Sequence, residues 1–230
     1  MAEATFHQFI RTRNYPKHAY KYFAPKKGSN PVNLITLIHG DSMIRRLHFE
    51  NNKTWTIVQC HRGGCYSEEK EEEIVGDLSY IKSFFPNFKI HLVLHFGTNN
   101  VGARNKNLRF TPKEYVNTFI PSLQCLSNVF PTLYISVSGL VPRNDFSEEV
   151  KETNLRLKNA LAPLNPRIIF FNTSNLFLIK SEGESKIKIR DNSCFAKDQL
   201  HFNKRGNKIF ADKIDSVIQN RRIPGLGQVV

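Results

Sequence analysis

The stretch Gly40-Asp41-Ser42 places a small residue, a carboxylate and a hydroxyl at the end of the apolar run NLITLIH. Two interpretations suit these residue types. Glycine, aspartate and serine are common in turns, and an aspartate or a serine caps a helix that follows. Alternatively, Ser42 is a nucleophile displayed at the carboxyl end of a central strand, where a base can take its proton. The rest of the chain has to decide between them.

Three further polar segments follow apolar runs or precede the last predicted helix. They are HRGGC, with Gly63 and Gly64; GTNN, with Gly97, Asn99 and Asn100; and DQLHFNKRG, with Asp198 and His201. Each segment alone is ordinary turn chemistry, because glycine and asparagine commonly end strands. Four such segments in this order indicate a functional site.

The elements that would position these segments alternate along the chain. Short continuous apolar runs predict strands buried on both faces, at 33–40, 54–60, 89–97, 132–140 and 167–172. Apolar residues three and four apart predict helices over 66–85, 111–128, 147–162 and 203–220, with irregular structure over the polar stretch 181–197. This alternation predicts an α/β fold with a five-stranded parallel sheet between helical layers. Sites in such sheets form at the carboxyl ends of the strands.

On these four segments the sequence resembles the SGNH hydrolases, also called the GDSL esterases. The blocks of that family are Gly-Asp-Ser, a glycine after the second strand, Gly-x-Asn, and Asp-x-x-His near the C-terminus. The resemblance covers about residues 34–220. It implies a three-layer α/β/α, flavodoxin-like architecture and a serine esterase or deacetylase that hydrolyses carboxylic esters. Asn100 stands where the family often has an aspartate, which removes a charge from the loop but no catalytic role.

The resemblance also implies a role for each matched residue. Ser42 would be the nucleophile, His201 its base, and Asp198 the carboxylate that fixes the tautomer of His201 and stabilises the imidazolium. The oxyanion hole would consist of the backbone N–H of Ser42, a backbone N–H from the second block and the side-chain amide of Asn99. We choose Gly64 over Gly63 for the second block, although spacing hardly separates the two. The ester or acetylated substrate would bind at this site.

Other polar residues near the four segments have simpler explanations. Asp41 is expected to be structural, with its carboxylate bonded to backbone groups of the turn. His39 and His95 end their strands near the same edge and are expected to be packed histidines. For His61, beside the second block, a place in the lining of the pocket is the less favoured of two alternatives. Two other functions stay open. The fold could be a non-catalytic module that binds RNA or protein, or a flavodoxin-like nucleotide binder, although a glycine-rich phosphate loop after the first strand is missing.

The charge of the chain, +13, favours polyanionic partners, whether nucleic acid or an anionic membrane surface. Much of it lies in residues 1–33, where aromatic residues alternate with six cationic side chains: Arg11, Arg13, Lys17, Lys21, Lys26 and Lys27. Cations and stackable rings together suit single-stranded RNA. In the alternative interpretation these rings pack on the domain. We therefore predict a basic aromatic arm over 1–33, a hydrolase domain over 34–220 and a C-terminal tail over 221–230.

A narrower resemblance points in the same direction. DQLHFNKRGNKIFADKI and GTNNVG are similar to the esterase domains in first-open-reading-frame proteins of LINE-type retrotransposons. Those proteins combine an SGNH domain with nucleic-acid-binding segments. This resemblance implies that the protein associates with nucleic acid.

The cysteines bear on the compartment and on metal binding. The four cysteines include no CxxC pair, which is typical of a reducing compartment, and the N-terminus lacks the apolar core of a signal peptide. We therefore expect an intracellular, cytoplasmic protein, with the nucleus as an open alternative. Cys60, His61 and Cys65 could form half of a metal site, but no second pair of ligands has suitable spacing. We expect neither a metal nor a cofactor.

Overall fold

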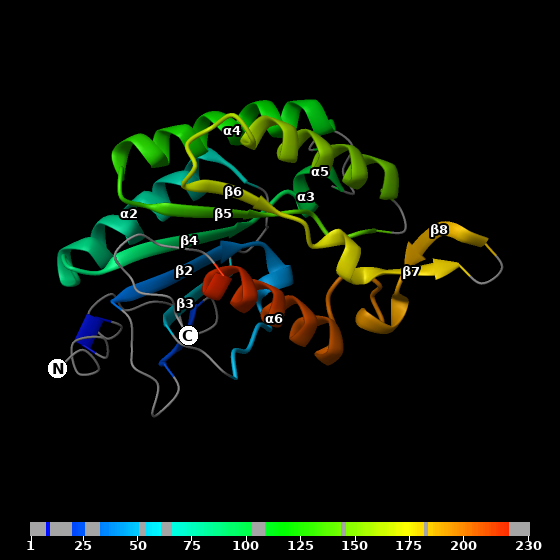
Figure 1. Cartoon of the computed structure of the whole chain (residues 1–230), viewed down its shortest axis with the longest axis horizontal. Helices are drawn as coiled ribbons and strands as arrows, with labels where there is room; N and C mark the ends of the chain where they lie inside the picture. The colour runs from blue at the N-terminus through cyan, green and yellow to red at the C-terminus, as the bar shows by residue number, and fades with distance from the viewer. Residues whose placement is uncertain are drawn as a thin grey trace.

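The computed structural model describes residues 8–9, 20–25, 33–50, 54–60, 66–102, 109–143, 146–181 and 184–220. A six-stranded sheet forms its centre, in the order β1-β3-β2-β4-β5-β6 (Figure 1). Its strands are β1 (Tyr20–Phe23), β2 (Leu34–Gly40), β3 (Trp55–Cys60), β4 (Lys89–His95), β5 (Tyr134–Ser138) and β6 (Ile168–Phe171). The five predicted strands are parallel to one another, as expected, and β1 pairs antiparallel with β3.

Helices cover both faces of the sheet, which confirms the predicted three-layer α/β/α arrangement (Figure 1). One face carries α2 (Glu68–Phe84), α4 (Pro112–Val129) and α5 (Ser147–Leu161), and the other carries α6 (Lys204–Asn220). Strand β2 is buried along its whole length because it lies between the two layers. Its side chains alternate: Ile35 and Leu37 pack toward α2 and α4, and Leu34 and Ile38 pack toward α6.

Helix boundaries follow local signals in the sequence. Helix α4 begins at Pro112 behind a capping box, in which Thr111 and Glu114 bond to each other's backbone N–H groups. Helix α2 has three glutamates in its first turn, where the helix dipole favours negative charge. Both helices agree with the predicted ranges to within about two residues. Among the described residues, no helix is long and apolar enough to cross a membrane.

The N-terminal segment contributes to the body of the fold. Strand β1 pairs with β3 from Tyr20 to Phe23, and Phe9 is fully buried against rings of α2. The sheet therefore includes residues that precede the predicted domain boundary at residue 34. In the alternative interpretation, the aromatic rings of residues 1–33 pack on the domain, and Phe9 does so. Of the six cations proposed for RNA binding, Lys21 is described, and it is exposed on β1. The other five lie outside the described residues, so RNA binding stays a prediction.

One predicted loop is wrong. The stretch 181–197 contains a strand, β8 (Glu184–Arg190), which pairs antiparallel with β7 (Leu178–Ser181) and forms a ribbon that projects from the body (Figure 1). The sequence ESKIKIR alternates apolar and polar residues with a period of two, which is a strand signal. Its high charge obscured that signal.

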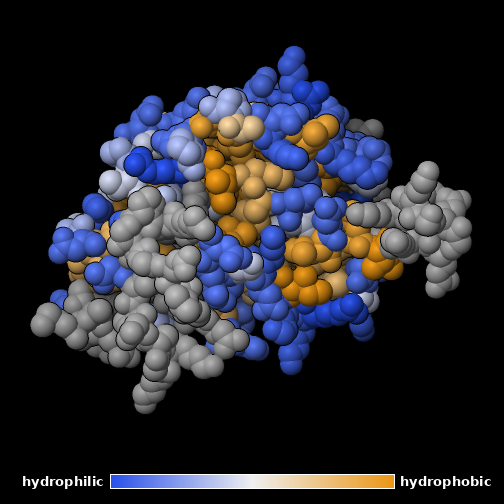
Figure 2. All heavy atoms as spheres, in the orientation of Figure 1, coloured by the Kyte–Doolittle hydropathy of each residue, from blue (hydrophilic) through white to orange (hydrophobic). Residues whose placement is uncertain are grey.

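The open edge of the sheet is apolar. Edge strand β6 has two half-buried residues, Ile169 and Phe170, between its buried ends. In Figure 2, apolar residues gather in the middle of the side of the molecule that faces the viewer, between the upper helical layer and α6. Among the described helices, three cover the first face of the sheet and only α6 covers the second, so the second helical layer is the narrower one.

Candidate active site

The carboxyl end of β2 lies between two parallel neighbours. Gly40 is in register with Cys60 of β3 and with His95 of β4, and the Asp41 N–H donates to the His95 carbonyl at 3.0 Å. A Cβ on Gly40 would lie 2.6 Å from that carbonyl oxygen, so the close approach requires glycine. The ends of β2 and β4 are thereby held together, which fixes the residues that follow Gly40.

Asp41 turns the chain out of the sheet. Its Oδ1 accepts a hydrogen bond from the Met43 N–H at 2.9 Å and caps the short helix η1 (Ser42–Ile44). This is the structural role predicted for Asp41, and it leaves Ser42 on the first turn beyond the strand. The Ser42 side chain is half-buried, whereas Met43 and Ile44 pack into the core beneath it. Ser42 therefore lies on a turn that is fixed from below, and its side chain is partly accessible at the surface of the protein.

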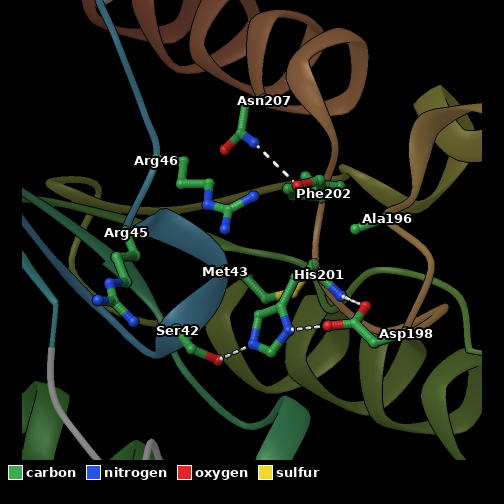
Figure 3. Close-up of a pocket in the computed structure, with 9 residues that line it drawn as sticks. All are labelled: Ser42, Met43, Arg45, Arg46, Ala196, Asp198, His201, Phe202 and Asn207. Atoms are coloured by element: carbon green, nitrogen blue, oxygen red, sulfur yellow. Dashed lines mark hydrogen bonds and ion pairs between the residues drawn. The ribbon is translucent and has the colours of Figure 1, made fainter.

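Ser42, His201 and Asp198 form one hydrogen-bonded chain (Figure 3). Ser42 Oγ lies 2.8 Å from His201 Nε2, and His201 Nδ1 lies 2.7 Å from Asp198 Oδ2. A histidine with a carboxylate on one ring nitrogen and a serine hydroxyl on the other is arranged to take the serine proton. The structure thus brings together the three residues predicted for this chemistry.

Asp198 is fixed by three hydrogen bonds. Oδ1 accepts from the N–H groups of Leu200 and His201 at 2.9 and 3.0 Å, and Oδ2 accepts from the imidazole. The hydrogen bond to His201, followed by the two backbone bonds, holds the pKa of Asp198 well below its ordinary value. The carboxylate therefore stays charged beside His201, although half of its side chain is exposed.

The segment that carries His201 is anchored from both sides. The Ala196 N–H donates to the His201 carbonyl at 2.7 Å, and Phe195 and Phe202 form a bridge between extended segments. The Phe202 ring is buried and stacks on Phe177. Because backbone bonds and a buried ring fix both flanks of His201, the imidazole is positioned before any substrate binds.

The predicted oxyanion donors are only partly described. The backbone N–H of Ser42 and the side-chain amide of Asn99 have no hydrogen-bond partner among the described residues, so both could donate to a ligand. Asn99 lies on the short helix α3 (Thr98–Val101), directly after β4. Gly63 and Gly64 lie outside the described residues, as does His61, so the choice between the glycines stays open.

Asn100 has a structural role that the sequence did not indicate. Its side-chain amide accepts from the Tyr66 N–H at 2.8 Å and donates to the Tyr66 carbonyl at 3.2 Å. Tyr66 is buried and packs on Phe96 and Phe119. An aspartate could not make the second of these bonds, since a carboxylate has no donor. The asparagine therefore fixes the approach to α2 relative to α3.

Buried ionisable groups lie at the carboxyl ends of β2 and β4. His95 bonds through Nδ1 to Ser138 Oγ at 2.9 Å, and burial lowers its pKa to about 3. His39 lies with Nε2 3.4 Å from Asp77 Oδ2. Both are packed histidines, as predicted. Burial also raises the pKa of Asp41 to about 7, opposed by the Met43 N–H, the Thr98 hydroxyl and the charges of His201 and Arg143.

A hollow of about 120 Å³ opens beside Ser42 and His201 (Figure 3). Its lining combines the three hydrogen-bonded residues with two arginines and several packed side chains: Ser42, Met43, Arg45, Arg46, Ala196, Asp198, His201, Phe202 and Asn207. A comparable cavity of about 150 Å³ holds one benzene molecule, so this space suits a small group. Sequence reasoning missed Arg45, Arg46 and Asn207, because in a strongly basic chain an arginine after a turn carries no distinguishing signal.

The comparisons with known proteins rest on structure, since no protein-family model and no curated protein matches the chain. A Streptococcus pneumonia protein described as a candidate platelet activating factor superposes with a TM-score of 0.58 at 13% identity, over 94% of this chain and 92% of its own. An acetylxylan esterase from Geobacillus stearothermophilus gives 0.54 at 12%, over 85% and 97%. A carbohydrate esterase of family 3 from Talaromyces cellulolyticus gives 0.52 at 12%, over 80% and 95%.

These similarities establish the fold. The chain has the architecture of the SGNH/GDSL-type esterases, with a mostly parallel central sheet of six strands. The fold implied by the resemblance is therefore confirmed. The narrower resemblance to retrotransposon proteins has no counterpart among the structures named here and stays a prediction.

Proposed function

We propose that this protein is a serine esterase that hydrolyses short-chain carboxylic esters through an acyl-enzyme. The observation that carries the proposal is the hydrogen-bonded chain from Ser42 through His201 to Asp198, on a rigid turn at the carboxyl edge of the sheet. Its position supports the assignment, because sites of open parallel sheets form at this edge. The esterase fold of the structural neighbours is consistent with hydrolysis.

In the proposed reaction, His201 Nε2 takes the proton of Ser42 while Oγ attacks the ester carbonyl. The oxyanion of the tetrahedral intermediate is held by the Ser42 N–H, the Asn99 amide and a backbone N–H of the second block. The imidazolium, stabilised by Asp198, then protonates the departing alkoxide, and the bond between the carbonyl carbon and that oxygen breaks. A water molecule repeats the sequence on the acyl-enzyme, releasing the carboxylic acid and restoring Ser42.

The size of the site favours a small acyl group. The hollow beside Ser42 has a volume of about 120 Å³, which suits an acetyl or similar group better than a long fatty acyl chain. Two of the structural neighbours are described as an acetyl esterase and an acetylxylan esterase. We therefore propose that the substrate is an acetyl or other short-chain ester.

The experiment is active-site labelling combined with ester hydrolysis. Wild-type protein should react covalently with a fluorophosphonate probe and hydrolyse 4-nitrophenyl acetate, and Ser42→Ala should lose both activities. His201→Ala should lower both by several orders of magnitude. Ser83→Ala, which removes an exposed hydroxyl on α2, is the matched control and should behave like the wild type. Equal labelling and turnover in wild type and Ser42→Ala would refute the proposal. Absence of both activities in wild type would also refute it and would favour a non-catalytic binding module.

A further inference from the structure

Two arginines follow the proposed nucleophile by three and four residues and line the same hollow. Arg45 and Arg46 lie directly after the short helix η1, and both side chains are exposed. Figure 3 shows the Arg46 guanidinium above the His201 imidazole in this view, and the Arg45 side chain on the other side of η1 from His201. Neither residue takes part in the proposed transfer of the acyl group.

Neither guanidinium has a hydrogen-bond or ion-pair partner among the described residues. Two cations of α6 differ in this respect. Lys208 pairs with Asp212 at 3.1 Å, and Arg205 lies 3.7 Å from Asp191. The one carboxylate in the lining of the hollow, Asp198, is already bonded to His201. The hollow therefore carries two positive charges that the described part of the protein leaves unneutralised.

A third group in the lining is buried with unused bonding capacity. Asn207 is 7% exposed, and its Nδ2 donates to the carbonyls of Phe202 and Asn203 at 3.1 and 2.8 Å. These two bonds fix the amide, and its Oδ1 has no hydrogen-bond partner among the described residues. A buried polar atom without a partner costs free energy, which a ligand that donates a hydrogen bond would recover. The lining thus offers two cationic donors and one neutral acceptor.

We propose that Arg45 and Arg46 bind an anionic group, such as a carboxylate or a phosphate, that the ester substrate carries close to its scissile bond. This inference rests on the proposed esterase function and deepens it by naming the substrate class. A guanidinium binds such oxyanions through paired N–H donors, which makes the contact directional as well as electrostatic. Since both arginines line the same hollow as Ser42, the charge would lie on the part of the acid or of the alcohol that is next to this hollow when the ester is bound.

The exposure of the two arginines limits how strongly the site can prefer an anionic ester over a neutral ester. An exposed ion pair alone contributes little, whereas paired hydrogen bonds from a guanidinium to an oxyanion contribute more. We therefore expect loss of both arginines to lower the selectivity for an anionic ester at least tenfold. Because the pairs are exposed, the selectivity should also fall as salt is added.

The test compares kcat/KM for matched charged and neutral esters. One arm places the charge in the acyl group, with 4-nitrophenyl hydrogen adipate against 4-nitrophenyl hexanoate. The other places it in the leaving group, with 4-acetoxybenzoate against its methyl ester. Each ratio of charged to neutral ester is measured in wild type, in Arg45→Gln, in Arg46→Gln and in the double variant. Differences in intrinsic reactivity cancel when the ratios are compared between proteins.

The inference predicts that in one arm the ratio falls at least tenfold in the double variant. The arm that responds shows whether the charge belongs to the acid or to the alcohol. Arg156→Gln removes an arginine on α5, outside this site, and should leave both ratios unchanged. Ratios that agree within twofold between wild type and the double variant in both arms would overturn the inference, while hydrolysis of the neutral esters would still support the esterase.

A separate readout covers the case in which wild type hydrolyses none of the esters. The proposed function would then have failed, and calorimetric binding of adipate and of uncharged adipamide to Ser42→Ala would decide the inference. Binding of adipate alone, lost in the additional absence of Arg45 and Arg46, would support an anion site. Equal or absent binding of the two compounds would refute it. Circular dichroism of every variant checks that it is folded.

Discussion

The carboxyl group of Asp41 is fully buried beneath Ser42, and the pH dependence of stability tests what this burial costs. Its Oδ1 accepts a hydrogen bond from the Met43 N–H, and this bond and the Thr98 hydroxyl offset the cost of burial only in part. Burial raises the pKa of Asp41 to about 7, from a value near 4 in the unfolded chain. At a pH between these two pKa values, the Asp41 carboxyl group is protonated in the folded state and ionised in the unfolded state.

The sign and size of the pH effect follow from that difference. For a carboxyl group whose pKa is higher in the folded state, stability is greatest at low pH and declines as the pH rises through the interval. The decline approaches about 1.4 kcal/mol per pH unit and stops above pH 7, where both states are charged. Between pH 4.5 and 7.5 this group should therefore cost roughly 3 kcal/mol of unfolding free energy.

The perturbation is Asp41→Asn, which keeps the acceptor for the Met43 N–H and removes the titration. Urea unfolding of both proteins at pH 4.5 and pH 7.5 gives four free energies. The variant should gain roughly 3 kcal/mol relative to wild type between the two pH values, whatever its stability at either one. Asp212→Asn, which removes an exposed carboxylate on α6, is the control and should show little relative change. A difference between Asp41→Asn and wild type that stays constant within about 1 kcal/mol would refute the assigned burial cost.

Three further predictions concern residues around Ser42. Asp198→Asn should lower kcat on the order of 10⁴-fold, because a carboxamide favours the wrong tautomer of His201. Its stability deficit relative to wild type should shrink below about pH 4, since the low pKa of Asp198 stabilises the fold only while the carboxylate is charged. Asn99→Ala should lower kcat about 100-fold or more if its amide meets the oxyanion, and a change below tenfold in folded protein would place that donor elsewhere. Asn100→Ala should lower the urea-unfolding free energy by about 2 kcal/mol, because it leaves the buried Tyr66 N–H without a partner, and unchanged stability would contradict that role.

Most of the fold could be predicted from the sequence because its strongest signals are local. The strand from Leu34 to Gly40 is continuously apolar, as a strand covered on both faces must be. Of the strands that sequence reasoning missed, β1 is short and β8 is highly charged. Strand β1 forms by pairing with β3, which is distant in sequence, and β8 forms by pairing with β7 in a hairpin. Neither segment has an apolar run from which a strand could be predicted.

The sequence by itself determined which residue types were available for chemistry and the order in which the sheet would present them. A parallel sheet carries the ends of its strands to one edge, so Gly40-Asp41-Ser42 and the segment of His201 could be expected to meet there. Only the tertiary structure decided which polar groups are already bonded and which remain free, because that depends on contacts between distant segments. Asn100 is bonded to Tyr66, whereas Arg45, Arg46 and the Asn207 carbonyl lack partners within the described chain. Burial is decided in the same way. Asp41 has an ordinary carboxyl group in the unfolded chain, and its pKa rises because the folded chain excludes water from it.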